Sequence, residues 1–252
     1  MNLKSLRKNN RIIIEKYNLN VICLFIFSKI IIKGKNNTIV FRGNFKFKNY
    51  FNILRGLNVR ICGDNNIIDI EFPIKIKRVK ISIVNDNNMF KIGSTPNLFA
   101  DANFDIGDGS SVIIGKNSEI YAGNLYCVAK HNYSTPHKLI IGDECYIAKD
   151  TIIRTSDGQT FLDPKTGEPL GEPQDITIGN HVWLMSRCMI VKGTEIPDGC
   201  AVAPYSFVNK KFQIKNAFIA GIPASIKKEN ILWSIDSYRN ARIKYEESEA
   251  KF

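Results

Sequence analysis

The sequence of 252 residues lacks the motifs that mark several common classes of protein. It has six cysteines but no Cys-x-x-Cys pair, no glycine-rich phosphate loop and no nucleic-acid-binding motif. No group of residues has the spacing of metal ligands. We therefore expect no disulfide framework, no metal and no nucleic-acid partner. A reducing cytoplasm is the expected compartment.

A long apolar run is also missing. Residues 21–32 are the most apolar stretch, and Ser28 and Lys29 interrupt it. A membrane-spanning helix needs about 20 apolar residues, so this stretch is too short. No small-residue cleavage site follows it, which argues against a signal peptide. Because basic residues precede the stretch, it could contact the inner membrane peripherally, but burial as a first coil or capping element is the favoured interpretation.

The chain has fewer acidic than basic residues. The chain has 24 Asp and Glu against 35 Lys and Arg, which gives a net charge of +11. Such a charge favours attraction to an acidic partner, for example an anionic polysaccharide, a nucleic acid or a membrane surface. A basic but merely solvated surface is the alternative interpretation.

What the sequence does contain is a repeat of six residues between Ile141 and Val208. The first position of each block is aliphatic, and the fifth is small and uncharged in every block but one. The first positions are Ile141, Ile147, Ile153, Ile178, Leu184, Ile190, Ile196 and Val202. The fifth positions are Cys145, Thr151, Asp157, Val182, Cys188, Thr194, Cys200 and Ser206.

A period of six fits neither an α-helix nor an alternating strand, and it is typical of a β-helix. Each block forms one short strand, and three blocks form a triangular coil of about eighteen residues. The first residue fills the interior, and the fifth lies at a tight corner. Cysteines at that fifth position are therefore expected to be packing residues.

The repeat breaks after Asp157. Residues 159–177 are rich in proline and glycine and form an extended loop. Because a loop on a rigid scaffold often carries function, we expect binding or chemistry there.

Upstream, asparagine pairs recur in GKNNTI (34–39), GDNNII (63–68) and NDNNMF (85–90), and they suggest tight corners. The predicted segments are an apolar and basic cap (1–33), irregular coils (34–105), regular hexads (106–219) and a C-terminal coil end with a short helix (220–252). Residues 126–139, which include His131 and His137, fit the hexads poorly and are expected to bulge outward.

His181 and Trp183 follow the loop and are two residues apart. On a strand they would share one face, and the inward hexad positions beside them make that face outward. An outward tryptophan indicates a covered cleft, a ligand or a subunit interface. A purely structural interface tryptophan beside a bystander histidine is the alternative.

The run from Ile152 to Leu184, with IVKGTEIPDG and AGIPASIKKENILW after it, resembles the left-handed β-helix sugar O-acetyltransferases, and in particular the polysialic acid O-acetyltransferases of bacterial capsule loci. The resemblance implies a homotrimer with acetyl-CoA in a cleft between adjacent β-helices. It also implies a general-base histidine in an S/T-D-x-H motif and a tryptophan beside the acetyl group.

The sequence departs from that pattern at the base. Gln159 stands where the resemblance implies the catalytic histidine, and an amide cannot accept a proton near neutral pH. His181, His131 and His137 are the candidate replacements. Met185 stands where a glycine is usual, and Pro204-Tyr205 replace residues that are usually small.

The remaining expectations concern the cofactor. Lys192, Lys210 and Lys211 could meet the CoA phosphates or be merely solvated. Ala203, Ser206 and Gly221 would allow pantetheine to approach the backbone, and Trp183, Met185 and Tyr205 would line the same cleft.

Two functions remain open. The first is acetyl-CoA-dependent O-acetylation of a capsular or other surface polysaccharide, impaired by Gln159. The second is a non-catalytic trimeric protein that binds glycans or assembles on the same scaffold. Nucleic-acid binding driven by charge ranks third.

Overall fold

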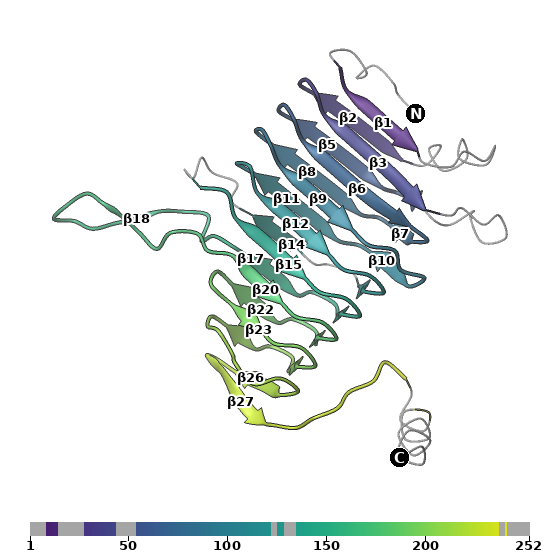
Figure 1. Cartoon of the computed structure of the whole chain (residues 1–252). Coiled ribbons are helices and arrows are strands. Elements are labelled where there is room, and N and C mark those ends of the chain that lie inside the picture. The colour runs from purple at the N-terminus through teal and green to yellow at the C-terminus, as the bar shows by residue number, and fades with distance from the viewer. Residues whose placement is uncertain are drawn as a thin grey trace.

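Figure 1 shows the computed structural model, which describes residues 9–14, 28–43, 54–121, 125–128, 135–236 and 240. Three sheets stack their strands along one axis and enclose a continuous core, and the strands are parallel except for the last strand of the second sheet. Successive strands of the chain pass from the first sheet to the second, then to the third and back to the first. The predicted parallel β-helix is confirmed.

The strands are short, as a coil built from six-residue sides requires. The first sheet contains β1 (Arg11–Ile14), β3 (Thr38–Gly43), β6 (Ile67–Phe72), β9 (Met89–Ile92), β12 (Ser111–Ile114), β15 (Lys138–Ile141), β20 (Ile176–Ile178) and β23 (Glu195–Ile196). The second contains β4 (Leu54–Arg55), β7 (Lys75–Lys77), β10 (Leu98–Ala100), β13 (Glu119–Ile120), β16 (Tyr146–Ile147), β21 (Trp183–Leu184), β24 (Ala201–Val202), β26 (Phe218–Gly221) and β27 (Ala224–Lys228). The third contains β2 (Lys29–Lys33), β5 (Asn58–Cys62), β8 (Lys80–Val84), β11 (Asn103–Gly107), β14 (Leu125–Val128), β17 (Ile152–Arg154), β22 (Met189–Val191) and β25 (Phe207–Val208).

The hexad assignment is confirmed by burial. Every first-position residue from Ile141 to Val202 is at most 2% exposed. The fifth-position residues are equally buried, except Asp157, which is exposed. Burial raises the pKa of the Cys145 and Cys188 thiols to about 12, so both remain neutral packing residues.

The fourth position of the hexads, except Ser156 in the hexad before the loop, has a role that the sequence did not reveal. Its backbone is left-handed, with φ of 58° at Glu144, 50° at His181, 63° at Arg187 and 58° at Tyr205. Each of these residues turns the chain into the corner where the buried fifth residue packs. Position four is therefore held at a corner, with its side chain outside the barrel.

The asparagine pairs follow the same rule. The first member has a left-handed backbone, as at Asn36, Asn65 and Asn87. The second member is buried, and its Oδ1 accepts hydrogen bonds from the backbone and the side chain of the next coil. This ladder links Asn10, Asn37, Asn66, Asn88 and the backbone N–H of Ser110 at 2.9–3.0 Å.

Coil length varies along the axis, as expected for the N-terminal part. Stacked corner residues are 29 positions apart from Asn37 to Asn66 and 22 apart from Asn66 to Asn88. They are 37 apart where the loop is inserted and 18 apart beyond it. Only the last coils have the ideal length.

Two expectations need comment. Residues 126–139 do not simply bulge outward, because Tyr126–Val128 lie in β14, Leu139 is fully buried and His137 is 8% exposed at a corner. The expected C-terminal helix and His131 lie outside the described residues, apart from the single helical residue Asn240. No helix within the described part of the chain is long and apolar enough to cross a membrane.

Candidate active site

The long loop leaves the barrel at the corner between the third and first sheets. It carries the short antiparallel hairpin of β18 (Phe161–Leu162) and β19 (Pro169–Leu170) and projects as an arm from the body (Figure 1). Asp163 stabilises the tip by accepting hydrogen bonds from the backbones of Lys165 and Thr166, which lowers its pKa. Phe161, Leu162 and Leu170 are 68%, 58% and 49% exposed. The arm therefore presents apolar side chains that its own chain does not cover.

An ion pair and two hydrogen bonds hold the base of the arm against the barrel. Lys192 forms an ion pair with Asp157 and donates to the carbonyl of Gly171, and Arg154 donates to the carbonyl of Asp157 at 3.0 Å. Gln159 follows immediately and is exposed. Lys192 thus already has partners, and a phosphate would have to compete with Asp157 for it.

Trp183 lies on the outer face of the second sheet. It pairs in register with Tyr146 on one side and with Ala201 on the other. Its indole packs against Tyr146 at 6.3 Å and against Trp233 at 5.7 Å between ring centroids. The indole N–H of Trp183 is buried and has no hydrogen-bond partner among the described residues. A buried donor without a partner is rare and costly, and because this N–H is covered within one chain, a ligand oxygen reaches it only if a covering side chain moves.

His181 lies on the same side of the barrel as Trp183, but not for the predicted reason. It is not in a strand; it turns the corner before β21 with φ of 50°. Its ring stacks on Trp233 at 4.1 Å with 12° between the planes. Nε2 is 3.2 Å from the carbonyl of Trp233, and the indole of Trp233 donates to the carbonyl of His181 at 3.0 Å.

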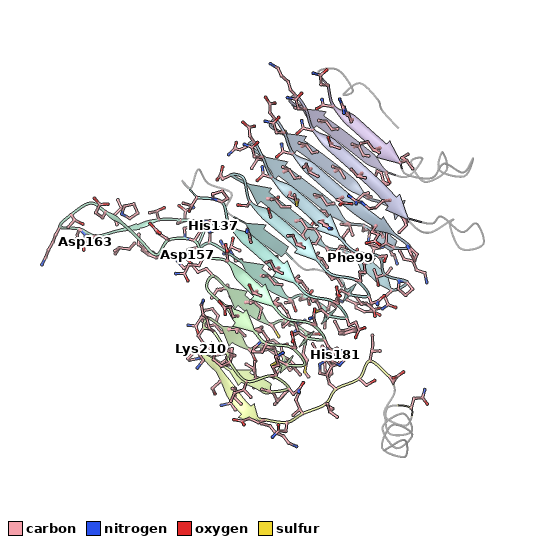
Figure 2. The ribbon with its side chains drawn as sticks, in the orientation of Figure 1. Phe99, His137, Asp157, Asp163, His181 and Lys210 are labelled. Atoms are coloured by element: carbon pink, nitrogen blue, oxygen red, sulfur yellow. The ribbon has the colours of Figure 1, made fainter. Side chains whose placement is uncertain are left out.

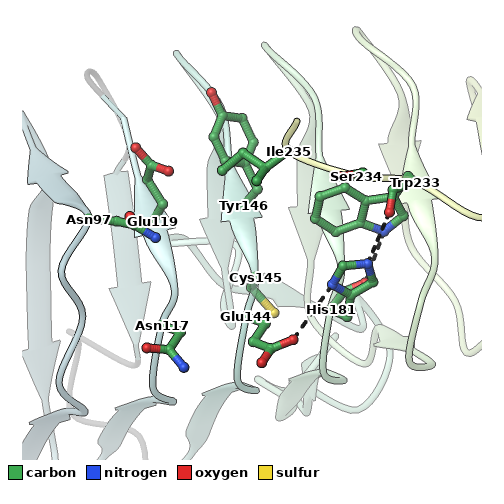
Figure 3. Close-up of a pocket in the computed structure, with 10 residues that line it drawn as sticks. All are labelled: Asn97, Asn117, Glu119, Glu144, Cys145, Tyr146, His181, Trp233, Ser234 and Ile235. Atoms are coloured by element: carbon green, nitrogen blue, oxygen red, sulfur yellow. Dashed lines mark hydrogen bonds and ion pairs between the residues drawn. The ribbon is translucent and has the colours of Figure 1, made fainter. Parts of the chain in front are cut away.

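This geometry bears on the use of His181 as a base. If Nε2–H donates to the carbonyl of Trp233, Nδ1 carries the free lone pair. Nδ1 faces Glu144 at 3.9 Å (Figure 3). Both ring nitrogens are therefore directed at groups of the same chain, which favours a positioning role for His181.

His137 lies at the same corner as the arm. Its Nδ1 is 3.7 Å from the carboxylate of Asp175, where the loop returns to the barrel, and its Nε2 is 3.3 Å from the hydroxyl of Thr135. Because the side chain is only 9% exposed, it is open to a substrate over very little of its surface.

The residues expected to hold the cofactor fall into two groups. Gln159, Lys192, Lys210 and Lys211 lie at or beyond the corner that carries the arm. Lys211 pairs with Glu195, and Lys210 lies 5.4 Å from the ring of Phe212. Trp183, Met185, Ala203, Tyr205, Ser206 and Gly221 lie on the second sheet or at the corner after it.

Two members of the second group have defined contacts. Ser206 is 1% exposed and accepts a hydrogen bond from the backbone of Gly221 at 3.3 Å. Tyr205 is 61% exposed, and its hydroxyl binds Arg187. Ser206 therefore contributes a small corner rather than an open hydroxyl, whereas Tyr205 and Arg187 offer polar groups to the outside.

The two groups do not meet within one chain. Asp157, at the base of the arm, lies at the corner between the third and first sheets, and His181, beside Trp183, lies at the corner between the first and second sheets, so the width of the first sheet separates them (Figure 2). A site that contains both Gln159 and Trp183 therefore needs two copies of the chain.

A pocket lies next to Trp183, between the corners of four successive coils and the segment that follows β27. It encloses about 220 Å³. Figure 3 shows Asn97, Asn117 and Glu119 at one end and Trp233 over His181 at the other.

Sequence reasoning missed Trp233 and Glu144. Trp233 lies about fifty residues beyond His181, so no local pattern connects the two. Glu144 is the fourth residue of its hexad, and only the knowledge that this position turns a corner would have pointed to it.

The chain was compared with known proteins. No family model matches it. A polysialic acid O-acetyltransferase of Escherichia coli O1:K1 / APEC is 34% identical over 126 residues, which are 50% of this chain and 39% of that protein. The Neisseria meningitidis polysialic acid O-acetyltransferase is 28% identical over 193 residues, 71% of this chain and 90% of that protein. The galactoside O-acetyltransferase of Escherichia coli K12 is 30% identical over 122 residues, 48% of this chain and 55% of that protein.

Two solved structures resemble the whole chain. The polySia-specific acetyltransferase NeuO has a TM-score of 0.64 at 22% identity and 95% coverage of both chains. The polysialic acid O-acetyltransferase OatWY has a TM-score of 0.61 at 23% identity and 94% coverage of both. At this identity the likeness shows the fold, a left-handed β-helix. In its hexads, the interrupting loop and Trp183 the chain resembles the hexapeptide-repeat O-acetyltransferases, and it spans about 39% and 55% of the length of the two Escherichia coli relatives.

Proposed function

We propose that the protein transfers the acetyl group of acetyl-CoA to a hydroxyl of a surface polysaccharide. The observation that carries the proposal is Trp183, an outward tryptophan of the second sheet whose indole N–H has no hydrogen-bond partner among the described residues. An acetyl or thioester oxygen is a suitable acceptor for it.

The outer face of the second sheet supports this assignment because it changes character at Trp183. Toward the C-terminus its side chains are apolar: Ala201 and Phe218 are in register with Trp183, and Ala203 and Ala220 lie beside them. Toward the N-terminus they are polar, at Tyr146 and Glu119. A pantetheine chain fits the apolar half of this face, and a hydroxylated acceptor fits the polar half.

In the proposed reaction an acceptor hydroxyl attacks the thioester carbonyl and loses its proton. The C–S bond breaks, and CoA leaves as a thiol after protonation. Binding both substrates in one cleft supplies much of the rate, because it converts an encounter into a positioned reaction. Donors directed at the developing oxyanion supply more. Gln159 can hydrogen-bond the hydroxyl but cannot take its proton. We therefore propose that this protein transfers acetyl more slowly than the same chain would with a histidine at position 159.

The active unit is proposed to be a homotrimer. In a ring of identical copies, the arm corner of one chain faces the second sheet of the next, which unites Gln159 with Trp183. The uncovered Phe161, Leu162 and Leu170 of the arm would then be buried against the neighbour.

Sedimentation is therefore expected to give a particle of three 28.5 kDa chains at micromolar concentration. Phe161→Asp combined with Leu162→Asp should shift it toward monomers, because the change buries charge in the contact. Lys165→Asp, at the tip of the same arm, is the control and should leave the trimer intact. A stable wild-type monomer would remove the shared site.

Acetyl-CoA is expected to change the fluorescence of Trp183. The chain has two tryptophans, so Trp233→Phe leaves Trp183 as the single reporter. Saturable quenching by acetyl-CoA is the expected result. No response in this variant, with binding seen by calorimetry, would place the cofactor away from Trp183.

Charge reversal at Lys210 and Lys211 is expected to weaken acetyl-CoA binding, most strongly at low salt. The matched control is reversal of Lys75 and Lys77, which are exposed on β7 in the N-terminal part of the barrel. Equal affinity in wild type and the Lys210/Lys211 variant would place the phosphates elsewhere.

The second candidate is a trimeric protein that binds glycans or assembles without catalysis. Gln159 is the observation that favours it, since the expected base is missing. Glycan binding without release of CoA thiol would identify it.

A further inference from the structure

We propose that the pocket beside Trp183 is the acceptor subsite and that it selects an uncharged, hydroxyl-rich sugar unit over one that carries a carboxylate. This inference rests on the proposed function for its role in transfer. It differs in substrate class from what the names of the polysialic acid relatives state.

The position of the pocket is the first argument. Its floor includes Tyr146 and His181, the neighbours of Trp183 in register and in sequence. It extends from there along the polar half of the second sheet. A sugar bound in it would place a hydroxyl next to the indole of Trp183, where the acetyl group is proposed to lie.

The shape and lining of the pocket are the second argument. Trp233 and Ile235 form an apolar wall across from the amides of Asn97 and Asn117. Amides donate and accept, and carboxylates accept, so the lining matches a ring with several hydroxyls. A few placed polar groups on an otherwise aromatic surface are typical of small-molecule sites.

Charge is the third argument. Glu119 and Glu144 line the pocket, and none of its described lining residues is lysine or arginine. The nearby cation Lys116 is paired with Glu71 at 3.4 Å. Nδ1 of His181 lies 3.9 Å from the carboxylate of Glu144. The lining that this chain contributes to the pocket is therefore negative, although the whole chain is positive.

Glu119 is held as a hydrogen-bond acceptor. It is 8% exposed, and the hydroxyl of Tyr121 is directed at it, which raises the pKa of Tyr121 to about 12. A carboxylate buried in this way would repel a second carboxylate in the same pocket, because interaction between like charges is strong where water is excluded. The same oxygens can accept a neutral hydroxyl.

The experiment compares oligosialic acid with its carboxyl-reduced form, which keeps the hydroxyls and loses the charge, and with neutral malto-oligosaccharides. Transfer is followed by CoA release and ester formation, and glycan binding by saturation-transfer NMR without acetyl-CoA. We expect the carboxyl-reduced form to exceed the charged form by about tenfold or more in both binding and kcat/KM. Glu144→Gln and, separately, Glu119→Gln should narrow that ratio. Glu229→Gln, an exposed change outside the pocket, should not.

A wild-type preference for the charged glycan would overturn the inference. A ratio unchanged by both glutamine variants would also overturn it. If the protein binds neutral glycans with the expected selectivity but neither binds acetyl-CoA nor releases thiol, the proposed transferase function fails while the selectivity of the pocket stands.

Discussion

Gln159→His is expected to raise the rate of acetyl transfer by about 10²–10⁴-fold, the usual contribution of a general base. Glutamine and histidine are similar in reach, and Gln159 is exposed in the loop, so the substitution should not disturb the stacked coils. The measurement is glycan-dependent release of thiol from acetyl-CoA. The rate of the variant should rise with pH through about 6.5, because only the neutral imidazole accepts a proton.

Two controls locate the base. If wild type is already fast and His137→Ala abolishes transfer, the base is His137 with Asp175 as its orienting partner. If His181→Ala has that effect and Gln159→His has none, the base lies beside Trp183. Equal, slow rates in wild type and Gln159→His, with acetyl-CoA bound to both, would contradict the assignment of position 159.

Asn66→Ala is expected to destabilise the N-terminal coils by about 3 kcal/mol, because it deletes a buried side chain that joins three coils. Oδ1 of Asn66 accepts from the backbone and the side chain of Asn88, and its Nδ2 donates to Asn37 and to the carbonyl of Asn85. Deletion leaves a buried N–H at Asn88 without its partner. Urea unfolding followed by circular dichroism measures the loss.

Asn58→Ala is the matched control, because Asn58 is exposed in the neighbouring strand β5. It should change stability by less than about 0.5 kcal/mol. Since each coil contacts mainly its neighbours, hydrogen exchange in Asn66→Ala should increase around β3, β6 and β9 and much less around β22–β25. Similar losses in both variants would show that the ladder contributes little.

The sequence was sufficient for the architecture because the hexad is a local rule. An aliphatic first residue and a small fifth residue repeat wherever the coil is regular, and both are buried as predicted. The asparagine pairs predicted corners correctly, but the buried ladder of their second members was not foreseen. Hydrogen bonds between residues more than twenty positions apart leave no periodic mark in a chain with coils of unequal length.

The candidate site was predictable only in part. Trp183 and the loop could be proposed from the sequence because they follow or interrupt the repeat. His181 was assigned to the correct face by a strand argument that does not hold, since it occupies a left-handed corner. Trp233 was missed, because its contact with His181 depends on how the segment after β27 crosses the second sheet. That path follows from packing and not from a local pattern.

The most direct test of the central claim is whether two defective copies restore each other. The double variant Gln159→His/Trp183→Ala keeps the proposed base and lacks the indole, whereas Gln159→Ala keeps the indole and lacks the base. Both variants keep the arm, so both can assemble. Unfolding and refolding a mixture of the two should restore about a quarter of the Gln159→His rate, because a heterologous interface can unite the intact half of each copy. Transfer of acetyl to glycan by the mixture, with none by either variant alone, is the predicted result. A mixture that stays inactive while the parent trimer transfers acetyl would contradict a site shared between copies.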